Sequence, residues 1–331
     1  MMRAVVLTRA GGPESLAIRQ HERPAPGPGD VLVRVRTTAL NRADILQREG
    51  RYPPPPGAPK DIPGLEIAGE IAALGSGATR WAAGARVFGI VGGGAHAEFV
   101  VTSQDALAGI PESLSWIEAA AIPEAFITAH DAMVTQADVA AGETVLIHAV
   151  ASGVGLAAVQ IARAWGAIPF GTTRTKEKLA AARDVGLEDG ITITREFDPL
   201  VAAVERWTSG RGIDVALDLV GGPYLAASVQ VAATRGRIMI IGSLGGGTSD
   251  FPLGVVLKRR LQLRGTVLRS RSLAEKVDAT ERFAREVVPL FTSGKLRPTI
   301  DSVFPFDKIA DAHRRMESNE SVGKIVVEVN G

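Results

Sequence analysis

Cysteine is absent from this chain of 331 residues, which removes disulfides, thiolate nucleophiles and cysteine-ligated zinc from consideration. A chain without cysteine fits a reducing compartment, so we expect the protein in the cytoplasm. The 37 basic and 36 acidic residues nearly cancel, and the chain as a whole has no excess charge with which to attract nucleic acid or acidic lipid. Charged residues interrupt every long apolar run, so we expect no membrane span and no signal peptide.

Histidine is scarce, and the histidines are too far apart in the sequence to suggest a metal site. Metal-binding histidines usually recur at short, fixed spacings. No such spacing is found among the five histidines, which are His21, His96, His130, His148 and His313. We therefore predict a protein that binds no metal.

The first third of the chain has the pattern of a β-rich domain. Short apolar segments alternate with turns rich in glycine and proline, notably residues 24–29 and 53–57. The expected strands cover residues 4–7, 31–37, 67–74, 86–90 and 97–101. Because 331 residues exceed the usual size of one hydrophobic core, we assign residues 1–122 to a first domain.

From Pro123 onward, strands and helices alternate, which indicates an α/β fold with a parallel sheet. The six expected strands cover residues 143–150, 167–172, 189–194, 213–220, 235–242 and 261–268. They predict a doubly wound sheet that binds its ligand at the carboxyl ends of the strands, in a domain of residues 123–268. The tail, residues 269–331, is too short for a core of its own, and we expect it to join the first domain. Its expected elements are helices at 273–292 and 306–317 and a strand at 324–329.

A glycine-rich turn follows the first strand of this sheet. Gly153, Gly155 and Ala158 match the G-x-G-x-x-G/A pattern between a strand and a helix. The glycines permit a tight turn and a close approach to a pyrophosphate, whose charge then faces amides at the helix N-terminus. Val154 lies inside the turn. The hydroxyl of Ser152 can donate to a cofactor phosphate; the alternative is that Ser152 is simply a small residue that fits the turn. We predict a dinucleotide site here.

The end of the second strand indicates which dinucleotide binds. A site that prefers NAD usually places an acid at this point, but the first acid here is Glu177. Arg174, Thr175 and Lys178 can instead donate to a 2′-phosphate. The alternative is that these cations form the solvated start of a helix. We predict NADPH rather than NADH.

Several ordered motifs across essentially the whole chain resemble the medium-chain dehydrogenase/reductase superfamily, and its zinc-free quinone oxidoreductase branch fits best. The motifs are residues 39–44 (ALNRAD), 64–69 (GLEIAG), 119–125 (AAAIPEA), 148–155 (HAVASGVG), 268–271 (LRSR) and 322–326 (VGKIV). The resemblance implies a GroES-like, β-rich catalytic domain and a Rossmann domain. It also implies self-association, as a homodimer or possibly a homotetramer, with residues 234–244 and the loop 245–254 as the expected contact.

Compared with the zinc enzymes of that superfamily, two ligand positions have changed. Leu65 occupies the position of the zinc-binding histidine, and Asn41 that of the first zinc-binding cysteine. Leucine cannot bind zinc, and oxidation of an alcohol needs a Lewis acid to stabilise the alkoxide. The resemblance therefore implies hydride delivery to an acceptor that is already electrophilic.

The resemblance also implies roles for particular residues. Asn41 and Tyr52 would face the nicotinamide and the acceptor, although a turn amide and a half-buried loop aromatic are the alternatives. Ile193 stands where relatives often place a tyrosine against the adenosine, and Thr128 matches a position beside the nicotinamide. The loops after the last three strands would wrap the nicotinamide and its ribose, with Val220, Gly242, Ser243, Leu244, Leu268 and Arg269.

These observations predict an NADPH-dependent quinone reductase that acts on a small planar acceptor. A reductase of activated C=C bonds, such as 2-alkenals or enoyl thioesters, remains the first alternative. A thioester reductase needs a basic rim, for which Arg42, Arg48 and Arg51 are available. A more remote alternative is a relative that binds RNA or has a structural role, which the near-neutral charge disfavours.

Overall fold

The computed structural model describes residues 1–194 and 196–329, which form two compact units. Unit 1 comprises Met1–Ile127 and Leu268–Gly331, and unit 2 comprises Thr128–Val267. The sequence suggested domain boundaries between residues 122 and 123 and between residues 268 and 269. In the structure, the first boundary lies five residues later and the second lies one residue earlier. Within the described residues, no helix is both long and apolar enough to span a membrane.

Unit 2 contains the parallel, doubly wound sheet that the sequence predicts. The strand order is β10-β9-β8-β11-β12-β13, and every pair is parallel. The strands are β8 (Thr144–Ile147), β9 (Ile168–Thr173), β10 (Asp189–Thr192), β11 (Ile213–Asp218), β12 (Ala232–Ile240) and β13 (Gln262–Gly265). The helical segments are α3 (Thr128–His130), η4 (Asp131–Gln136), α4 (Gly153–Ala164), α5 (Lys176–Asp184), α6 (Asp198–Thr208), α7 (Pro223–Val231) and α8 (Leu253–Arg259). The order reverses between β8 and β11, which is where this fold class binds ligands.

Strand β12, which contains part of the segment expected to contact a second subunit, is not at the edge of the sheet. Residues 234–240 belong to β12, which pairs with β11 on one side and β13 on the other. An interior strand has no free backbone groups to offer a second subunit, so the sheet cannot continue into a second subunit through residues 234–240, whereas a contact through the loop 245–254 stays a prediction. On this side of the sheet the edge strand is β13, whose side chains are exposed or half-buried, and β10 is the opposite edge.

Unit 1 is rich in β-strands, as its turn-rich sequence predicts, and all its strand pairs are antiparallel except β14 with β15, which is parallel. A sheet of seven strands runs β14-β15-β3-β4-β5-β7, with β6 paired to β3, and β1 and β2 form a separate pair. The strands are β1 (Met2–Leu7), β2 (Leu16–His21), β3 (Asp30–Ala39), β4 (Glu66–Leu74), β5 (Arg86–Ile90), β6 (Phe99–Ser103), β7 (Leu107–Gly109), β14 (Ile300–Pro305) and β15 (Lys324–Glu328). The helical segments are η1 (Pro13–Ser15), α1 (Arg42–Arg48), η2 (Gln104–Ala106), α2 (Trp116–Ala120), η3 (Pro123–Ile127), α9 (Leu273–Glu286), α10 (Val288–Thr292), η5 (Phe306–Lys308) and α11 (Ile309–Glu317).

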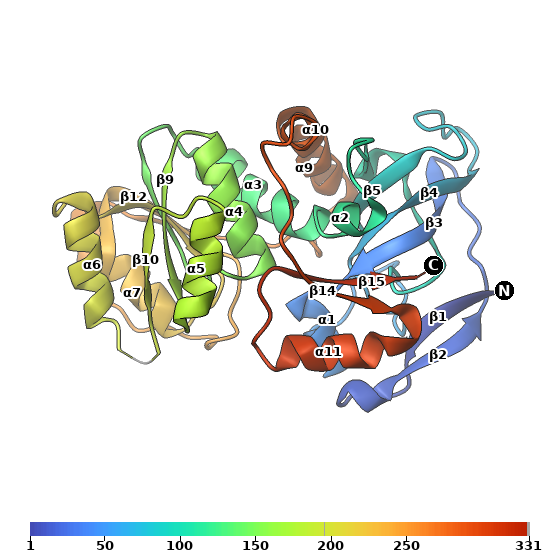
Figure 1. The fold of residues 1–331 in the computed structure, drawn as a ribbon, viewed down its shortest axis with the longest axis horizontal. Helices are drawn as coiled ribbons and strands as arrows, with labels where there is room; N and C mark the ends of the chain where they lie inside the picture. Colours follow the sequence, from blue (N-terminus) through green and yellow to red (C-terminus); the bar gives the residue numbers. More distant parts are fainter. Residues whose placement is uncertain (195, 330–331) are drawn as a thin grey trace. The chain divides into compact units, whose positions relative to one another are not determined.

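The C-terminal tail returns to the N-terminal sheet, as expected. In Figure 1 the red strands β14 and β15 lie beside the blue β3, with which β15 pairs antiparallel. The helix expected over residues 273–292 is divided into α9 and α10. Pro289 explains the break, because proline lacks an amide hydrogen and its ring crowds the carbonyl four residues earlier.

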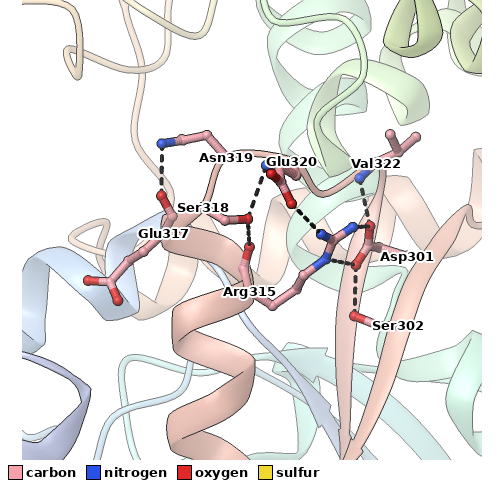
Figure 2. A network of polar contacts seen from close by, with 8 residues as sticks. All are labelled: Asp301, Ser302, Arg315, Glu317, Ser318, Asn319, Glu320 and Val322. Atoms are coloured by element: carbon pink, nitrogen blue, oxygen red, sulfur yellow. Dashed lines mark hydrogen bonds and ion pairs between the residues drawn. The ribbon is translucent and has the colours of Figure 1, made fainter.

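A polar network fixes the turn that leads into β15 (Figure 2). The Arg315 guanidinium on α11 donates to both oxygens of Asp301 on β14, at 2.9 and 3.0 Å, and to Glu320 at 3.1 Å. Asp301 also accepts from the amide of Val322 at 2.9 Å. Gly323 follows with φ of 83°, and a Cβ there would lie 2.3 Å from the Thr299 carbonyl oxygen. The network and this glycine together set where Lys324 begins β15.

Candidate active site

In unit 2, the glycine-rich turn that we expect to bind phosphate lies between a strand and a helix, as predicted. Strand β8 ends at Ile147, a tight turn with Ala149 at φ of 50° follows, and α4 begins at Gly153. A Cβ on Gly155 would lie 2.5 Å from the Val150 carbonyl oxygen, so only glycine allows the helix to begin this close to the turn. Because α4 begins six residues after the carboxyl end of β8, its N-terminus follows that end of the strand, which is the arrangement a pyrophosphate site requires.

Ser152 is the N-cap of α4. Its hydroxyl oxygen accepts a hydrogen bond from the Gly155 amide at 3.1 Å, which satisfies one of the first amides of the helix. The hydroxyl hydrogen can still donate, so both sequence-based interpretations of Ser152 stay open. Gly153 and Val154 occupy the first turn, where their amides have no partner within the helix.

The cations at the end of β9 lie together at the start of α5. Arg174 and Thr175 are exposed and Lys178 is half-buried. Thr175 caps α5 by accepting from the Lys178 amide at 3.4 Å. Hydrogen bonds from the backbone amide of Glu177 itself and, next, from the Thr175 hydroxyl lower the pKa of Glu177. Glu177 is thus drawn to the helix N-terminus, and Arg174, Lys176 and Lys178 are the positive side chains of the cluster.

The expected adenosine neighbour Ile193 lies in the core of unit 2. Its side chain is only 1% exposed, and its amide donates to the Thr173 carbonyl at 2.8 Å. Sequence reasoning overlooked Tyr224 at the start of α7, whose half-buried ring makes edge contacts with His148 and Phe197, with centroids 5.0 and 4.9 Å apart. The charge of Arg174 lowers the pKa of Tyr224, opposing the larger effect of burial. Tyr224 therefore lies close to the cation cluster.

The loops after β11 and β12 are held against each other. Asp218 accepts from the amides of Val220 and Gly221 at 2.9 and 2.8 Å, and the Gly245 amide donates to the Val220 carbonyl at 2.7 Å. Of the other expected contacts in unit 2, Ser243 and Leu244 are exposed, whereas Gly242 and Thr128 are half-buried.

In unit 1, the buried acid Glu66 organises the other group of candidate residues. Lys324 donates to Glu66 at 2.6 Å, to the Asn41 side-chain oxygen at 2.7 Å and to the Leu40 carbonyl at 2.9 Å. The Asn41 amide nitrogen in turn donates to Glu66 at 2.7 Å. The side chains of Glu66 and Lys324 are 0% and 6% exposed, so this ion pair is shielded from water.

Both the oxygen and the nitrogen of the Asn41 side-chain amide are therefore hydrogen-bonded, to Lys324 and Glu66 respectively. It also serves as the N-cap of α1, in a capping box with Asp44. Asp44 accepts from the backbone N–H of Asn41 at 2.7 Å and from the backbone N–H of Gly64 at 3.1 Å. These bonds hold Asn41 rigidly, so it can position other groups more readily than it can turn toward a ligand.

Tyr52 and Arg269 lie against each other. The Arg269 guanidinium lies 5.0 Å from the centroid of the Tyr52 ring and donates to the Tyr52 carbonyl at 3.4 Å and the Gly92 carbonyl at 3.0 Å. It also donates to the Gln47 side chain. Arg269 is 3% exposed and supports the Tyr52 loop, whereas Leu268, 6% exposed, is a buried apolar residue.

At the positions that bind zinc in the zinc enzymes, the described residues present no ligand set. Leu65 is a core residue, 1% exposed, and no group of three or more acids or histidines within residues 1–194 and 196–329 is placed to hold a metal ion. The ammonium of Lys324 instead lies between Asn41 and Glu66. This ion pair could not be predicted from the sequence, because its partners are 258 residues apart.

Comparison with known proteins assigns the chain to a family. The alcohol dehydrogenase GroES-like domain family matches residues 27–112, and the zinc-binding dehydrogenase family matches residues 193–327. A quinone oxidoreductase-like protein 2 homolog from Nematostella vectensis is 34% identical over 310 residues, covering 91% of this chain and 82% of that protein. The quinone oxidoreductase of Pseudomonas aeruginosa is 32% identical over 328 residues, covering 99% of each. The fold and these matches define a medium-chain dehydrogenase/reductase. Within that superfamily, the chain belongs to the quinone oxidoreductase branch.

Solved structures agree with this assignment. A mycobacterial protein complexed with NADPH has a TM-score of 0.89 at 25% identity, covering 99% of this chain and 100% of that one. An NAD-dependent alcohol dehydrogenase has a TM-score of 0.85 at 31% identity, with coverage of 99% and 100%. The JamJ enoyl reductase has a TM-score of 0.87 at 26% identity, with 100% of both chains covered. The chain is thus an oxidoreductase with a nicotinamide-dinucleotide-binding fold.

Proposed function

We propose that this protein reduces quinones with NADPH by hydride transfer and without a metal. The observation that carries the proposal is the buried ion pair of Lys324 and Glu66 beside Asn41 and Leu65. Leucine offers no ligand atom, and the Asn41 amide is already bonded to Lys324 and Glu66. Without a Lewis acid the chemistry that remains is reduction of an acceptor that is electrophilic by itself, as a quinone is.

The residues of unit 2 fit NADPH. At Gly155 there is no space for a side chain, so the backbone can come close to a bound pyrophosphate, and the backbone N–H groups of Gly153 and Val154 can donate to it. Arg174 and Lys178 can pair with a 2′-phosphate, each by a charge-assisted hydrogen bond. When bound, NADPH supplies the hydride, and these residues hold the nucleotide in a fixed register.

The residues of unit 1 fit a flat acceptor. Tyr52 is a half-buried aromatic residue, supported from one side by the buried guanidinium of Arg269. Such a ring can stack on a planar quinone, and its hydroxyl can donate to a quinone oxygen. Catalysis then depends mainly on holding donor and acceptor in register and on excluding water.

The arginines considered for a thioester substrate are largely committed elsewhere. Arg48 is 1% exposed and pairs with Glu317. Arg42 donates to the Asn319 side chain at 2.9 Å, and Arg51 pairs with Glu49 at 3.1 Å. A basic rim for the phosphates of coenzyme A would need such cations to be available, which favours the quinone over the enoyl thioester.

We also propose that the protein forms a homodimer through the β13 edge of unit 2. Helix α8 has no buried residue, and its Leu253 and Leu257 are 71% and 76% exposed. Leu244 and Val267 add exposed apolar surface at 51% and 45%. Exposed leucines beside an open strand edge are typical of a contact between subunits.

The substrate is tested by following NADPH oxidation with 1,2-naphthoquinone, a 2-alkenal and crotonyl-CoA in parallel. We expect the quinone to give the highest kcat/KM, and treatment with a chelator to leave that value unchanged. A higher kcat/KM with crotonyl-CoA would overturn the quinone assignment, and loss of activity on chelation would overturn the metal-free mechanism.

The cofactor preference is tested with Arg174→Ala and Lys178→Ala. Each removed charge-assisted bond is worth about 1.5–3 kcal/mol, so each variant should bind NADPH about 10- to 100-fold more weakly while NADH binding is unchanged. Arg211→Ala, an exposed cation just before the amino end of β11, is the control. Equal kcat/KM with NADPH and NADH in the unaltered protein would refute the preference.

A further inference from the structure

Glu124 is a second acid beside Glu66, and the proposed mechanism gives it no role so far. It lies in η3, and its backbone amide donates to the second oxygen of Glu66 at 2.8 Å. The groups that face Glu124 come from several elements of unit 1. They are Glu66 on β4, Lys324 on β15, Asp44 on α1, Lys276 on α9, and Tyr52 and Arg269 from loops.

Hydrogen bonding distinguishes Glu124 from the other two acids of this cluster. Glu66 receives donors on both oxygens, from Lys324, Asn41 and the Glu124 amide. Asp44 also receives a donor on each oxygen. Among the described residues, however, the buried Oε2 of Glu124 has no hydrogen-bond partner. A buried carboxylate oxygen without a donor is costly, whereas a protonated carboxyl is tolerated, so Glu124 is where the cluster holds a proton.

The electrostatics agree with this placement. Burial and the negative charge of Glu66 raise the pKa of Glu124 to about 8, against the opposing charges of Lys324 and Arg269. A carboxyl with that pKa is neutral and able to donate at pH 7, and it can lose its proton without a large penalty. A pKa close to the working pH is what general acid catalysis favours.

Glu124 is also close to the proposed acceptor residue. Burial raises the pKa of Tyr52 and lowers that of Arg269; the charge of an ionised Glu124 adds to the first shift and opposes the second, so Glu124 acts on the pair that we assign to the flat acceptor. The residue as a whole is half-buried rather than enclosed. A role in proton transfer requires this partial exposure, because the carboxyl must reach a ligand on the Tyr52 side and later be reprotonated by water.

We propose that the side-chain carboxyl of Glu124 is the proton donor to the reduced acceptor. This inference rests on the proposed quinone reduction. The quinone accepts a hydride, with its two electrons, from NADPH, which is oxidised to NADP⁺, and becomes a hydroquinone monoanion. The O–H bond of Glu124 then breaks as a new O–H bond forms on the anionic oxygen. Glu124 is left as a carboxylate and recovers its proton from solvent.

The test compares Glu124→Gln with wild type and with Glu112→Gln, an exposed glutamate of the same unit. In wild type, kcat should fall about tenfold per pH unit above pH 8, and Glu112→Gln should do the same. Glu124→Gln should lower kcat about 10- to 100-fold at pH 7, abolish the decline above pH 8 and leave the Kd for NADPH unchanged. Its deficit should grow with the basicity of the hydroquinone formed, an effect that a merely structural role would not produce.

A second measurement separates this inference from the proposed function. Infrared difference spectra of the whole protein, with and without the Glu124→Gln substitution, should show one carboxylic acid C=O band that disappears near pH 8. Absence of that band, or wild-type kcat with a retained high-pH decline in Glu124→Gln, would overturn the role of Glu124. If wild type reduces no quinone while the band is present, the proposed function fails, and the proton on Glu124 is still established.

Discussion

Replacing Lys324 by methionine tests whether the ammonium stabilises the buried cluster. The substitution removes three hydrogen bonds, at 2.6, 2.7 and 2.9 Å, and leaves the fully buried Glu66 without its counter-charge. Removing one partner of a buried ion pair costs about 3–5 kcal/mol, because the remaining charge is left uncompensated. We therefore expect the free energy of unfolding to fall by about that amount.

The pH dependence of this loss has a definite sign. Burial raises the pKa of Glu66, and the positive charge of Lys324 is the main influence that lowers it. Without Lys324 the pKa of Glu66 in the folded state should rise further, while in the unfolded state it keeps its ordinary value. A carboxyl whose folded pKa is raised loses stability as pH increases from the unfolded pKa toward the folded one. Lys324→Met should thus be more destabilised at pH 8 than at pH 5.

The assay is urea unfolding followed by circular dichroism at both pH values. With an m-value of about 3 kcal/mol/M, a loss of 3–5 kcal/mol lowers the midpoint by about 1–1.7 M. The double variant Glu66→Gln/Lys324→Met removes both charges and should recover part of the loss, which a matched Glu66→Gln control calibrates. A midpoint shift of less than about 0.3 M that is equal at pH 5 and pH 8 would refute the reasoning.

Three further predictions concern unit 2. Burial lowers the pKa of His148 to about 3, so as pH falls this histidine takes up a proton in the unfolded state before it does so in the folded state. Stability should therefore decline below pH 6.5 by up to about 1.4 kcal/mol per pH unit, a slope that His148→Gln should remove in urea titrations. Gly155→Ala places a Cβ 2.5 Å from a carbonyl oxygen and should lower both the melting temperature and the affinity for NADPH, unlike the control Gly254→Ala, where the added Cβ meets open space. Leu257→Glu should convert the homodimer to a monomer in light scattering, and a monomeric wild type would contradict the β13 contact.

The sequence predicted the architecture well where patterns are local. All six strands of unit 2 were anticipated, because each is a short apolar run bounded by turn residues. The ends were less accurate: the first strand was expected to reach residue 150 but stops at Ile147. Ala151 and Val150 are as buried as a strand residue although they lie in the turn, so hydrophobicity alone could not locate the end.

Strands without a clear apolar pattern were missed. Strands β2 and β14 have no buried residue, so neither has the alternation of buried apolar and exposed polar residues by which a strand is recognised. Helix α8 was missed for the same reason, since its leucines are exposed rather than directed to a core. These elements are defined by pairing or by surface exposure, which a single sequence does not show.

The candidate site shows a sharper limit of the same kind. The motifs containing Glu66, Glu124 and Lys324 were all recognised as family features, yet none of these three side chains was assigned a role. Their chemistry arises only when β4, η3 and β15 are brought together, as the bonds among the three residues show. Lys324 holds Glu66 as a carboxylate, and that negative charge in turn helps to keep the proton on Glu124. In the proposed mechanism, the cation that lies between Asn41 and Glu66 contributes to proton transfer indirectly, through the charge of its neighbour rather than by contact with the substrate.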